Sequence, residues 1–421
     1  MHRGKASRGG PQKALKGPDP MTAISAELNR KERYHPDILN FLRVLAALFV
    51  FFLHGSEFIP GMKTAEGPFV FLTKTPAWAG VWIFILLSCY LLGNGFLTGR
   101  YDIYKDPLSR KVSVKKVLIF YLKRFIRYAP IYYIYCFAFE FFSDRTFLWK
   151  KPGIALRILT FTFNGEGGIA GIGHLWYLSL SMQICLLMPW LFLLISKLGE
   201  RGRKIVFFAA LSGGLAVRGL LWYFEADWYT WVYTFVFSNL DIVVCGILLA
   251  MINHSVKEKA PEEKSPFWSR VIGVLCNLQF LLLVIYTSRI YANALPDDYF
   301  IYRYILPTLY IVSCGALIIR YHDPSAPKKK PPEKFRMLSV IDRFSEITFP
   351  FYVIHMQVFI YFDMTVGNAS FYANAPLWGR YIMFFGVCIP VTVLGAIVLK
   401  LAIDGVTAGL NRLVFGKEAR K

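Results

Sequence analysis

The chain has 421 residues, of which 55% are hydrophobic, 17% are aromatic and 18% are charged. This composition argues against a soluble enzyme, because soluble domains usually carry more charge and fewer apolar residues. A formal charge of +21 would suggest nucleic acid as the partner of a soluble protein. Here the basic residues lie between long apolar blocks, so we expect a phospholipid surface and no nucleic acid.

The first 36 residues are basic and polar and contain several Gly and Pro residues. We expect residues 1–36 to form a disordered cytoplasmic segment, because they have too few apolar residues to build a core. No cleavable signal peptide is recognisable, and Met21 is an alternative start of the protein.

The apolar blocks that follow are long enough to cross a bilayer as helices. Helices are expected because lipid leaves no other partner for the backbone polar groups. The sequence therefore predicts an all-α polytopic transmembrane helical bundle of about ten helices. It occupies residues 37–405, and residues 406–421 form a cytoplasmic tail. The predicted spans are 38–58, 77–97, 128–143, 174–197, 205–224, 230–252, 269–287, 302–319, 347–362 and 379–403. The shorter apolar segment 152–164 is interpreted as a re-entrant or interfacial helix.

The loops between these blocks alternate in charge. Segments 100–127, 197–204 and 320–343 are basic, whereas 225–227 and 296–298 are neutral or acidic. Because basic loops stay on the cytoplasmic side, both termini are expected to be cytoplasmic, in a multi-pass protein of the plasma (inner) membrane. Termini on one side require an even number of spans, which agrees with the predicted number.

Two polar residues stand out in the first apolar block. Arg43 and His54 are eleven residues apart, so they face one side of a helix at a separation of about 16 Å. An Arg inside a span is costly and often functional. The alternative is that Arg43 snorkels to the surface and His54 lies at the interface without a shared role.

Further polar residues lie in or beside the later blocks. Arg124 and Arg127 share a helix face, where two guanidinium groups are able to clamp a phosphate-rich ligand. Ordinary positive-inside anchoring explains them equally well. Each of the others is either functional or a structural hydrogen-bonding partner inside the bundle. These others are Glu140, His174, Arg218, Asp241 and His355.

Taken together, six segments in order resemble the motifs of membrane-bound acyltransferase family 3, whose members O-acylate sugars and cell-surface polysaccharides. The resemblance covers about residues 37–401. The segments are LNFLRVLAALFVFFLH, VWIFILLSCYLL, RFIRYAPIYY, HLWYLSLSMQICLLMP, NLDIVVCGILLA and ITFPFYVIHMQV. The chain departs from the family pattern at three positions. Asn40 stands where an acidic residue often precedes Arg43, Ser181 replaces a Glu, and Cys89 replaces a Gly.

The resemblance implies an acyl-CoA donor, expected to be acetyl-CoA, on the cytoplasmic side, and a carbohydrate acceptor at the outer face. It implies that Arg124 and Arg127 hold the donor phosphates. His54 would act as general base or carry the acyl group. Arg43 would stabilise the thioester oxygen or order the His54 site. The residues expected to line the acceptor end are His174, Tyr177, Asp241, Tyr352 and His355.

Other interpretations stay open at this stage. Asp241 and Arg218 also suit an ion pair inside the bundle. A non-enzymatic transporter or flippase of a lipid-linked sugar would need similar buried polar groups. In a different superfamily of membrane acyltransferases, His355 and not His54 would be essential. No metal is expected, since the seven cysteines form no CxxC pair and lie in apolar blocks. The glycan acceptor, the acyl chain length and the oligomeric state are not readable from the sequence.

Overall fold

The computed structural model describes residues 37–62, 77–106, 111–143, 150–165, 171–258, 266–292, 300–324 and 336–416. Within these ranges the regular secondary structure is helical, apart from an isolated bridge that pairs Tyr104 with Val112. The expected all-α fold is therefore confirmed. The segment predicted to be a disordered N-terminus, 1–36, lies outside the described residues.

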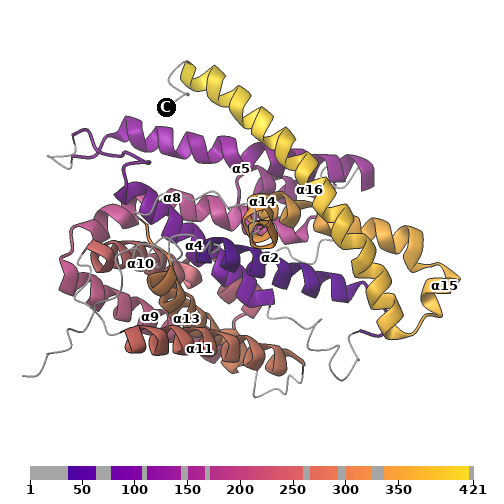
Figure 1. Ribbon diagram of the computed structural model, residues 1–421. Coiled ribbons are helices and arrows are strands. Elements are labelled where there is room, and N and C mark those ends of the chain that lie inside the picture. The colour runs from indigo at the N-terminus through magenta and orange to yellow at the C-terminus, as the bar shows by residue number, and fades with distance from the viewer. Residues whose placement is uncertain are drawn as a thin grey trace, which may run out of the picture.

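The helices follow the chain with short connections (Figure 1). The long ones are α2 (Ile38–Glu57), α4 (Ala77–Leu97), α5 (Val114–Ser143), α8 (Trp176–Ser196), α9 (Glu200–Tyr223), α10 (Leu240–Glu258), α11 (Pro266–Ala292), α13 (Leu306–Tyr321), α14 (Arg336–Phe362) and α16 (Leu377–Phe415). Short helices and turns lie between them: α7 (Pro152–Leu159), η1 (Gly173–Leu175), η2 (Trp228–Tyr233), η3 (Phe237–Asn239), η4 (Ile301–Ile305), η6 (Asp363–Gly367) and α15 (Ser370–Ala373).

In the part of the chain that the structure describes, nine helices are long and apolar enough to cross a membrane. The tenth long helix, α5, is not among them, because Lys123, Arg124 and Arg127 interrupt its apolar sequence. With α5 included, the helices agree with the ten predicted spans. The multi-pass membrane protein expected from the sequence is thus supported by the lengths and composition of its helices.

Several helices begin or end at other residues than the predicted spans do. The span predicted at 230–252 begins only at Leu240, because the aromatic residues before it fold as η2 and η3. The basic stretch before the span predicted at 128–143 is also helical, so α5 begins at Val114. The final helix continues to Phe415, so most of the expected cytoplasmic tail, 406–421, is helical.

The first helix begins where the sequence changes from polar to apolar. Asp37 caps α2, since its carboxylate accepts a hydrogen bond of 3.1 Å from the Leu39 amide. Proline lies inside four of the long helices, α5, α8, α14 and α16. Proline is tolerated inside membrane helices, because neighbouring helices satisfy the freed carbonyl groups.

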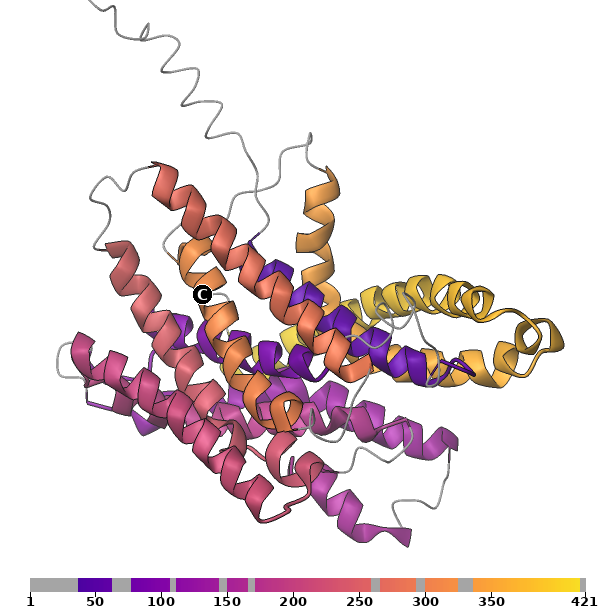
Figure 2. The ribbon, with the colours of Figure 1, turned by 90° about the horizontal axis from the view of Figure 1, so that it is seen from below.

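Helix α2 packs against both α4 and α14, and α14 packs against α16. Figure 2 shows α14 and α16 running out together to a turn around α15, at the edge of the bundle. One apolar cluster fills the space among α4, α8, α10 and α13. A second, aromatic cluster joins α2, α14 and α16 around Phe51, Phe359 and Phe384. Helix α2 therefore lies at the boundary between the two clusters.

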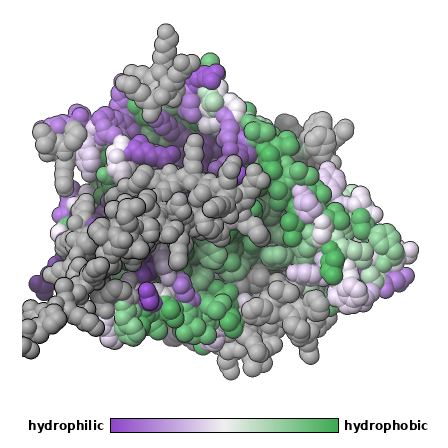
Figure 3. Space-filling view, in the orientation of Figure 1, coloured by the Kyte–Doolittle hydropathy of each residue, from purple (hydrophilic) through white to green (hydrophobic). Residues whose placement is uncertain are grey.

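The surface separates into hydrophilic and hydrophobic regions. In the view of Figure 3, hydrophilic residues gather at the upper left and hydrophobic residues cover the area over α16. Exposed apolar side chains on α16 include Leu394, Val398 and Leu401. Such a continuous apolar exterior is expected where lipid replaces water. Six of the seven cysteines are buried, and Cys276 is half-buried.

Candidate functional site

Three histidines from separate parts of the chain meet between α2, α14 and the start of α8. Nδ1 of His54 lies 2.8 Å from Nε2 of His355. The two rings are stacked, with centroids 5.1 Å apart and an interplanar angle of 8°. The ring of His174 packs edge-on against His355 at 5.0 Å. We call His54, His174 and His355 the histidine cluster.

The main chain of α14 holds two members of this cluster. The ring Nδ1 of His355 lies 2.5 Å from the Tyr352 carbonyl oxygen, and the ring Nε2 of His174 lies 2.9 Å from the Val353 carbonyl oxygen. The Tyr352 hydroxyl donates in return to the His174 carbonyl. Both His174 and His355 are buried. Adjacent carbonyls of one helix thus fix the orientation of two imidazoles.

His174 reaches the cluster because the chain turns back into the bundle before α8. Phe161 and Phe163 are buried, although they follow the short helix α7. Gly171 has a φ of 81°, a conformation that glycine adopts without strain, and its carbonyl accepts a hydrogen bond of 3.2 Å from the Tyr135 hydroxyl. Segment 152–164 therefore combines the short helix α7 with a buried end.

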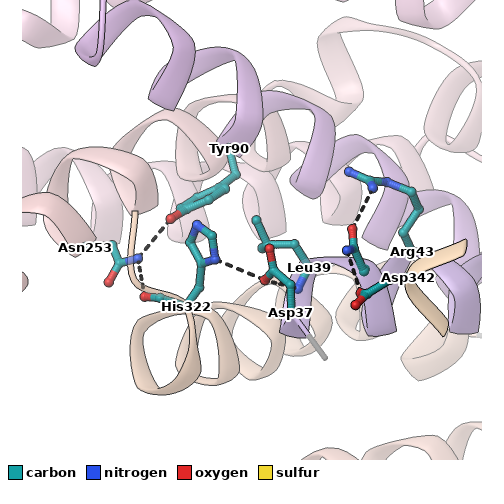
Figure 4. A network of polar contacts seen from close by, with 8 residues as sticks. Asp37, Leu39, Arg43, Tyr90, Asn253, His322 and Asp342 are labelled. Atoms are coloured by element: carbon teal, nitrogen blue, oxygen red, sulfur yellow. Dashed lines mark hydrogen bonds and ion pairs between the residues drawn. The ribbon is translucent and has the colours of Figure 1, made fainter. Parts of the chain in front are cut away.

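Arg43 does not point toward His54. Its Nη1 donates a hydrogen bond of 3.1 Å to the Asn40 side chain, one turn closer to the start of α2. The Asn40 amide donates in turn to Asp342 at 2.8 Å. Figure 4 shows this chain of contacts from Arg43 to Asp342. Asn40, which replaces an acidic residue of the family pattern, thus links α2 to α14.

The guanidinium of Arg43 lies within electrostatic range of Arg127, and the two positive charges repel each other. Tyr128 and Tyr177 also interact electrostatically with Arg43. Arg43 on α2 thus lies within electrostatic range of residues on α5 and α8. We call Arg43 and Arg127 the arginine pair. Two neighbouring cations in a membrane helix bundle favour binding of an anion.

Arg124 and Arg127 differ in environment. Arg127 is exposed, whereas Arg124 is buried and stacks on the rings of Tyr101 and Phe120 at 4.4 Å and 5.3 Å. The contact with Tyr101 holds the segment after α4 against α5. The structure therefore leaves Arg127 more accessible to a ligand than Arg124.

Aromatic residues lie between the histidine cluster and the arginine pair. The ring of Tyr352 lies 5.6 Å from His355 and 5.7 Å from Tyr177. Tyr177 in turn interacts electrostatically with Arg43. Ser181 stands where the family pattern has Glu. Its hydroxyl donates a hydrogen bond of 2.7 Å to the Tyr177 carbonyl, one turn earlier in α8. Tyr177 and Tyr352 connect the two polar groups along α8 and α14.

Asp241 lies in a different polar contact. Its Oδ2 accepts a hydrogen bond of 2.8 Å from Nη2 of Arg218, and both side chains are almost fully buried. Arg218 also donates to the Tyr304 carbonyl at 3.0 Å and to the Thr308 hydroxyl at 2.7 Å. The predicted ion pair between Asp241 and Arg218 is confirmed. The pairing favours a structural role for Asp241 over contact with an acceptor.

A second network, which the sequence did not indicate, lies at the start of α2. Asp37 accepts from the ring Nδ1 of His322 at 3.1 Å, and Asn253 donates to the Tyr90 hydroxyl and to the His322 carbonyl (Figure 4). Burial raises the pKa of Asp37, but the hydrogen bond and charge of His322 outweigh it and leave the pKa below its ordinary value. In the sequence, only the position of His322 just after an apolar block points to this network.

A sequence model of the family described as "Acyltransferase domain", acyltransferase family 3, matches residues 37–400. The match begins at the residue that caps α2 and ends within α16, so it includes the histidine cluster and the arginine pair. No curated protein and no solved structure matches the chain.

Proposed function

The chain belongs to acyltransferase family 3 and is a membrane acyltransferase, and we propose that it is an O-acetyltransferase. The donor is acetyl-CoA bound from the cytoplasm, and the acceptor is a sugar hydroxyl of a cell-surface or lipid-linked glycan. The observation that carries this proposal is the histidine cluster, in which Nδ1 of His54 lies 2.8 Å from Nε2 of His355. The histidine cluster suits proton transfer, and the arginine pair suits an anionic donor.

The arginine pair supports donor binding. The phosphates of acetyl-CoA are the anions that two guanidinium groups recognise best, through charge-assisted hydrogen bonds. Arg127 is exposed and Arg43 is its neighbour, so we place the phosphates at Arg43 and Arg127. Arg124 does not contact the phosphates in this proposal, and its guanidinium stacks on the Tyr101 ring instead. This assignment moves Arg43 from thioester stabilisation near His54 to the donor end.

His54 is the general base. Its imidazole takes the proton of the acceptor hydroxyl while the hydroxyl oxygen attacks the thioester carbonyl. The carbon–sulfur bond breaks as the ester forms, and the proton on His54 passes to the departing CoA thiolate. The products are an O-acetyl sugar and free CoA, so atoms and charge balance.

His174 supplies an acceptor-binding group. Its ring Nε2 bonds to the Val353 carbonyl, so Nδ1 carries the lone pair. Nδ1 is buried and has no hydrogen-bond partner among the described residues. A buried acceptor without a partner costs about 1–3 kcal/mol. A second hydroxyl of the sugar, donating to His174, would remove that cost.

The proposal is tested by transfer of labelled acetyl from acetyl-CoA in membranes that contain the full chain. Wild type is expected to form labelled ester and to release CoA thiol. His54→Gln at equal protein level should lose about 100-fold or more of this rate, as expected for loss of a general base. Arg127→Gln should raise the KM for acetyl-CoA about 10-fold, and leave kcat nearly unchanged, because it removes one charge-assisted contact.

A transporter of a lipid-linked sugar predicts a different result. It would move the glycan unchanged, release no CoA thiol and bind no acetyl-CoA. Absence of acetyl-CoA binding to purified wild type would therefore favour a transporter. Full activity of His54→Gln would reject His54 as the base.

A further inference from the structure

The contact between His54 and His355 joins two ring nitrogens and no carboxylate. The atoms are Nδ1 of His54 and Nε2 of His355, 2.8 Å apart. A neutral imidazole has one nitrogen that donates and one that accepts. One of these two nitrogens therefore carries the shared hydrogen, and the other presents its lone pair.

The main chain decides which nitrogen donates. Nδ1 of His355 lies 2.5 Å from the Tyr352 carbonyl oxygen, and a carbonyl only accepts. Nδ1 of His355 must therefore carry the hydrogen. The ring is 1% exposed, and a charged imidazolium is costly in such a place. In the neutral ring, Nε2 of His355 is then the acceptor.

The tautomer of His54 follows from that of His355. Because Nε2 of His355 accepts, Nδ1 of His54 must donate, and Nε2 of His54 is left with a free lone pair. We infer that His355 is a positioning residue, which holds His54 in the tautomer whose Nε2 is the base, and that it does not bind the acceptor. The inference rests on the proposed role of His54, but the tautomer itself does not.

The surroundings keep this geometry rigid. The two rings lie nearly parallel, at 8°, and Phe359 packs edge-on against His355 at 5.5 Å. Phe51 packs on Phe359 at 4.8 Å, one turn before His54 on α2. Phe51 and Phe359 thus hold the plane of the His355 ring, and the His54 ring stacks on His355. Rigid support of this kind is what a catalytic base needs from its neighbours.

The same contact serves the protonated base. When Nε2 of His54 takes the hydroxyl proton, the ring becomes an imidazolium with a hydrogen on each nitrogen. Its Nδ1 hydrogen still donates to the neutral His355, so the arrangement survives the step unchanged. The proton on Nε2 then leaves to the CoA thiolate. The pairing resembles the Asp–His part of a hydrolase triad, with a neutral imidazole in the place of the carboxylate.

The tautomer is measurable without any substrate. The chain has seven histidines, and ¹⁵N-labelled histidine in the purified full chain reports by NMR which ring nitrogen carries hydrogen. The signals of His54 are assigned as those lost in His54→Gln. At neutral pH we expect hydrogen on Nδ1 of His54 and none on Nε2. Hydrogen on Nε2 in the wild type would overturn the inference, whether or not acetyl transfer is observed.

The functional arm compares two substitutions at one position. His355→Leu removes the acceptor at similar volume, and His355→Gln places an amide oxygen, which accepts, near the position of Nε2. His355→Leu should lower kcat about 100-fold and leave both KM values within about twofold, as expected when a base is held in the wrong tautomer. His355→Gln should recover at least about a tenth of the wild-type kcat.

Phe362→Leu is the matched control, because it removes a buried ring of α14 that packs on Tyr372 and Phe384 and takes no part in the contact between His54 and His355. It should keep kcat near wild type. Thermal unfolding of each purified variant separates loss of folding from loss of catalysis. If His355→Leu kept the wild-type tautomer of His54 and raised the acceptor KM instead, His355 would be an acceptor-binding residue and the inference would be wrong. If wild type transferred no acetyl at all, the proposed function would fail while the NMR result still decided the tautomer.

Discussion

Buried polar side chains in this bundle are held in specific pairs, and the pairs explain most of the polar residues that the sequence placed in apolar blocks. Arg218 is 1% exposed and has three acceptors around it, from Asp241, Tyr304 and Thr308. In a low-dielectric interior a charge is tolerated when its partner and its remaining hydrogen bonds are all in place. Arg218 and Asp241 therefore link α9 to α10, and Oδ1 of Asp241 is a buried atom without a hydrogen-bond partner among the described residues.

Removing one member of this pair should be more damaging than removing both. Asp241→Asn leaves the Arg218 charge uncompensated, and we expect a loss of about 3–5 kcal/mol in the free energy of unfolding. Arg218→Met combined with Asp241→Leu should recover most of that loss, since no buried charge remains. Denaturant titration of purified variants measures both. Equal stability of the single and the double variant would contradict this account.

The contact between Asp37 and His322 makes a small part of the stability sensitive to acid. The pKa of Asp37 is lowered in the folded protein, so its contribution is full above the ordinary carboxyl range and is lost as the pH falls through the lowered value. Asp37 is about a third exposed, so the effect should stay below about 1 kcal/mol.

Asp37→Asn is expected to keep the cap of α2, because Asn caps helices as well as Asp does. The variant should be slightly less stable than wild type at pH 6, and the difference should shrink as the pH falls below about 4 and through the lowered pKa of Asp37. Thermal unfolding between pH 6 and pH 3 is the measurement. A difference that is as large at pH 3 as at pH 6 would show that the charge of Asp37 is not the cause.

At the residue scale, the sequence predicted which side chains matter better than it predicted their partners. Arg43 and His54 were correctly placed on one helix, but the partner of His54 is 301 positions away and nothing in the spacing indicates it. The hydrogen bond from Arg43 to Asn40 was also not predictable. A helical wheel shows on which face of the helix a residue lies, but it does not show the rotamer of its side chain.

At the element scale, α10 packs closely on α4 at Gly246, which has no side chain to hold the two helices apart. A Cβ at this position would lie 2.6 Å from the Cβ of Cys89, 3.0 Å from the Leu86 carbonyl oxygen and 3.1 Å from the Tyr90 nitrogen. Two of these three atoms belong to the backbone and cannot rotate away. Gly246, in the segment NLDIVVCGILLA, therefore sets the distance between two helices.

Gly246→Ala should force α10 away from α4 and destabilise the protein by about 1–3 kcal/mol, as overpacking of a core does. Gly386→Ala on α16 is the matched control, because nothing lies within 4 Å of a Cβ there. It should be neutral or slightly stabilising, since Ala is the better helix former. Equal unfolding temperatures for the two variants would reject the close contact at Gly246.

Element positions were predictable because the apolar blocks are as long as the bilayer is thick. Boundaries were less predictable for two physical reasons. Basic residues continue a helix beyond the apolar block, as at the start of α5. Apolar aromatic residues also fold into short helices and turns that are not part of a long helix, as in η2. Hydropathy predicts which residues lie in lipid, but it does not predict at which residue a helix begins or ends.

Over the whole molecule, the proposed donor and acceptor sites lie toward opposite ends of α2, with Arg43 near its start and His54 near its end. From the positively charged loops we expect the end near Arg43 to be cytoplasmic. The acetyl group is therefore expected to cross much of the bilayer within the bundle, along Tyr177 and Tyr352.

Sealed vesicles test this sidedness. Inverted vesicles should use acetyl-CoA added outside and collect the O-acetyl product in their lumen, whereas right-side-out vesicles should show no transfer from external acetyl-CoA until they are permeabilised. The physical reason is that acetyl-CoA is a large anion that does not cross lipid. Equal activity in both orientations would mean that the donor site opens to both sides.

The burial of the cysteines makes the native chain a convenient background for chemical mapping. Six thiols are buried among the helices and the seventh, Cys276, is half-buried in α11, so a charged, water-soluble maleimide should react slowly with the wild type. A single cysteine introduced into an exposed loop would then be the dominant labelled position. Reaction from one face of a sealed vesicle would assign each loop to its side of the membrane, with no native cysteine replaced.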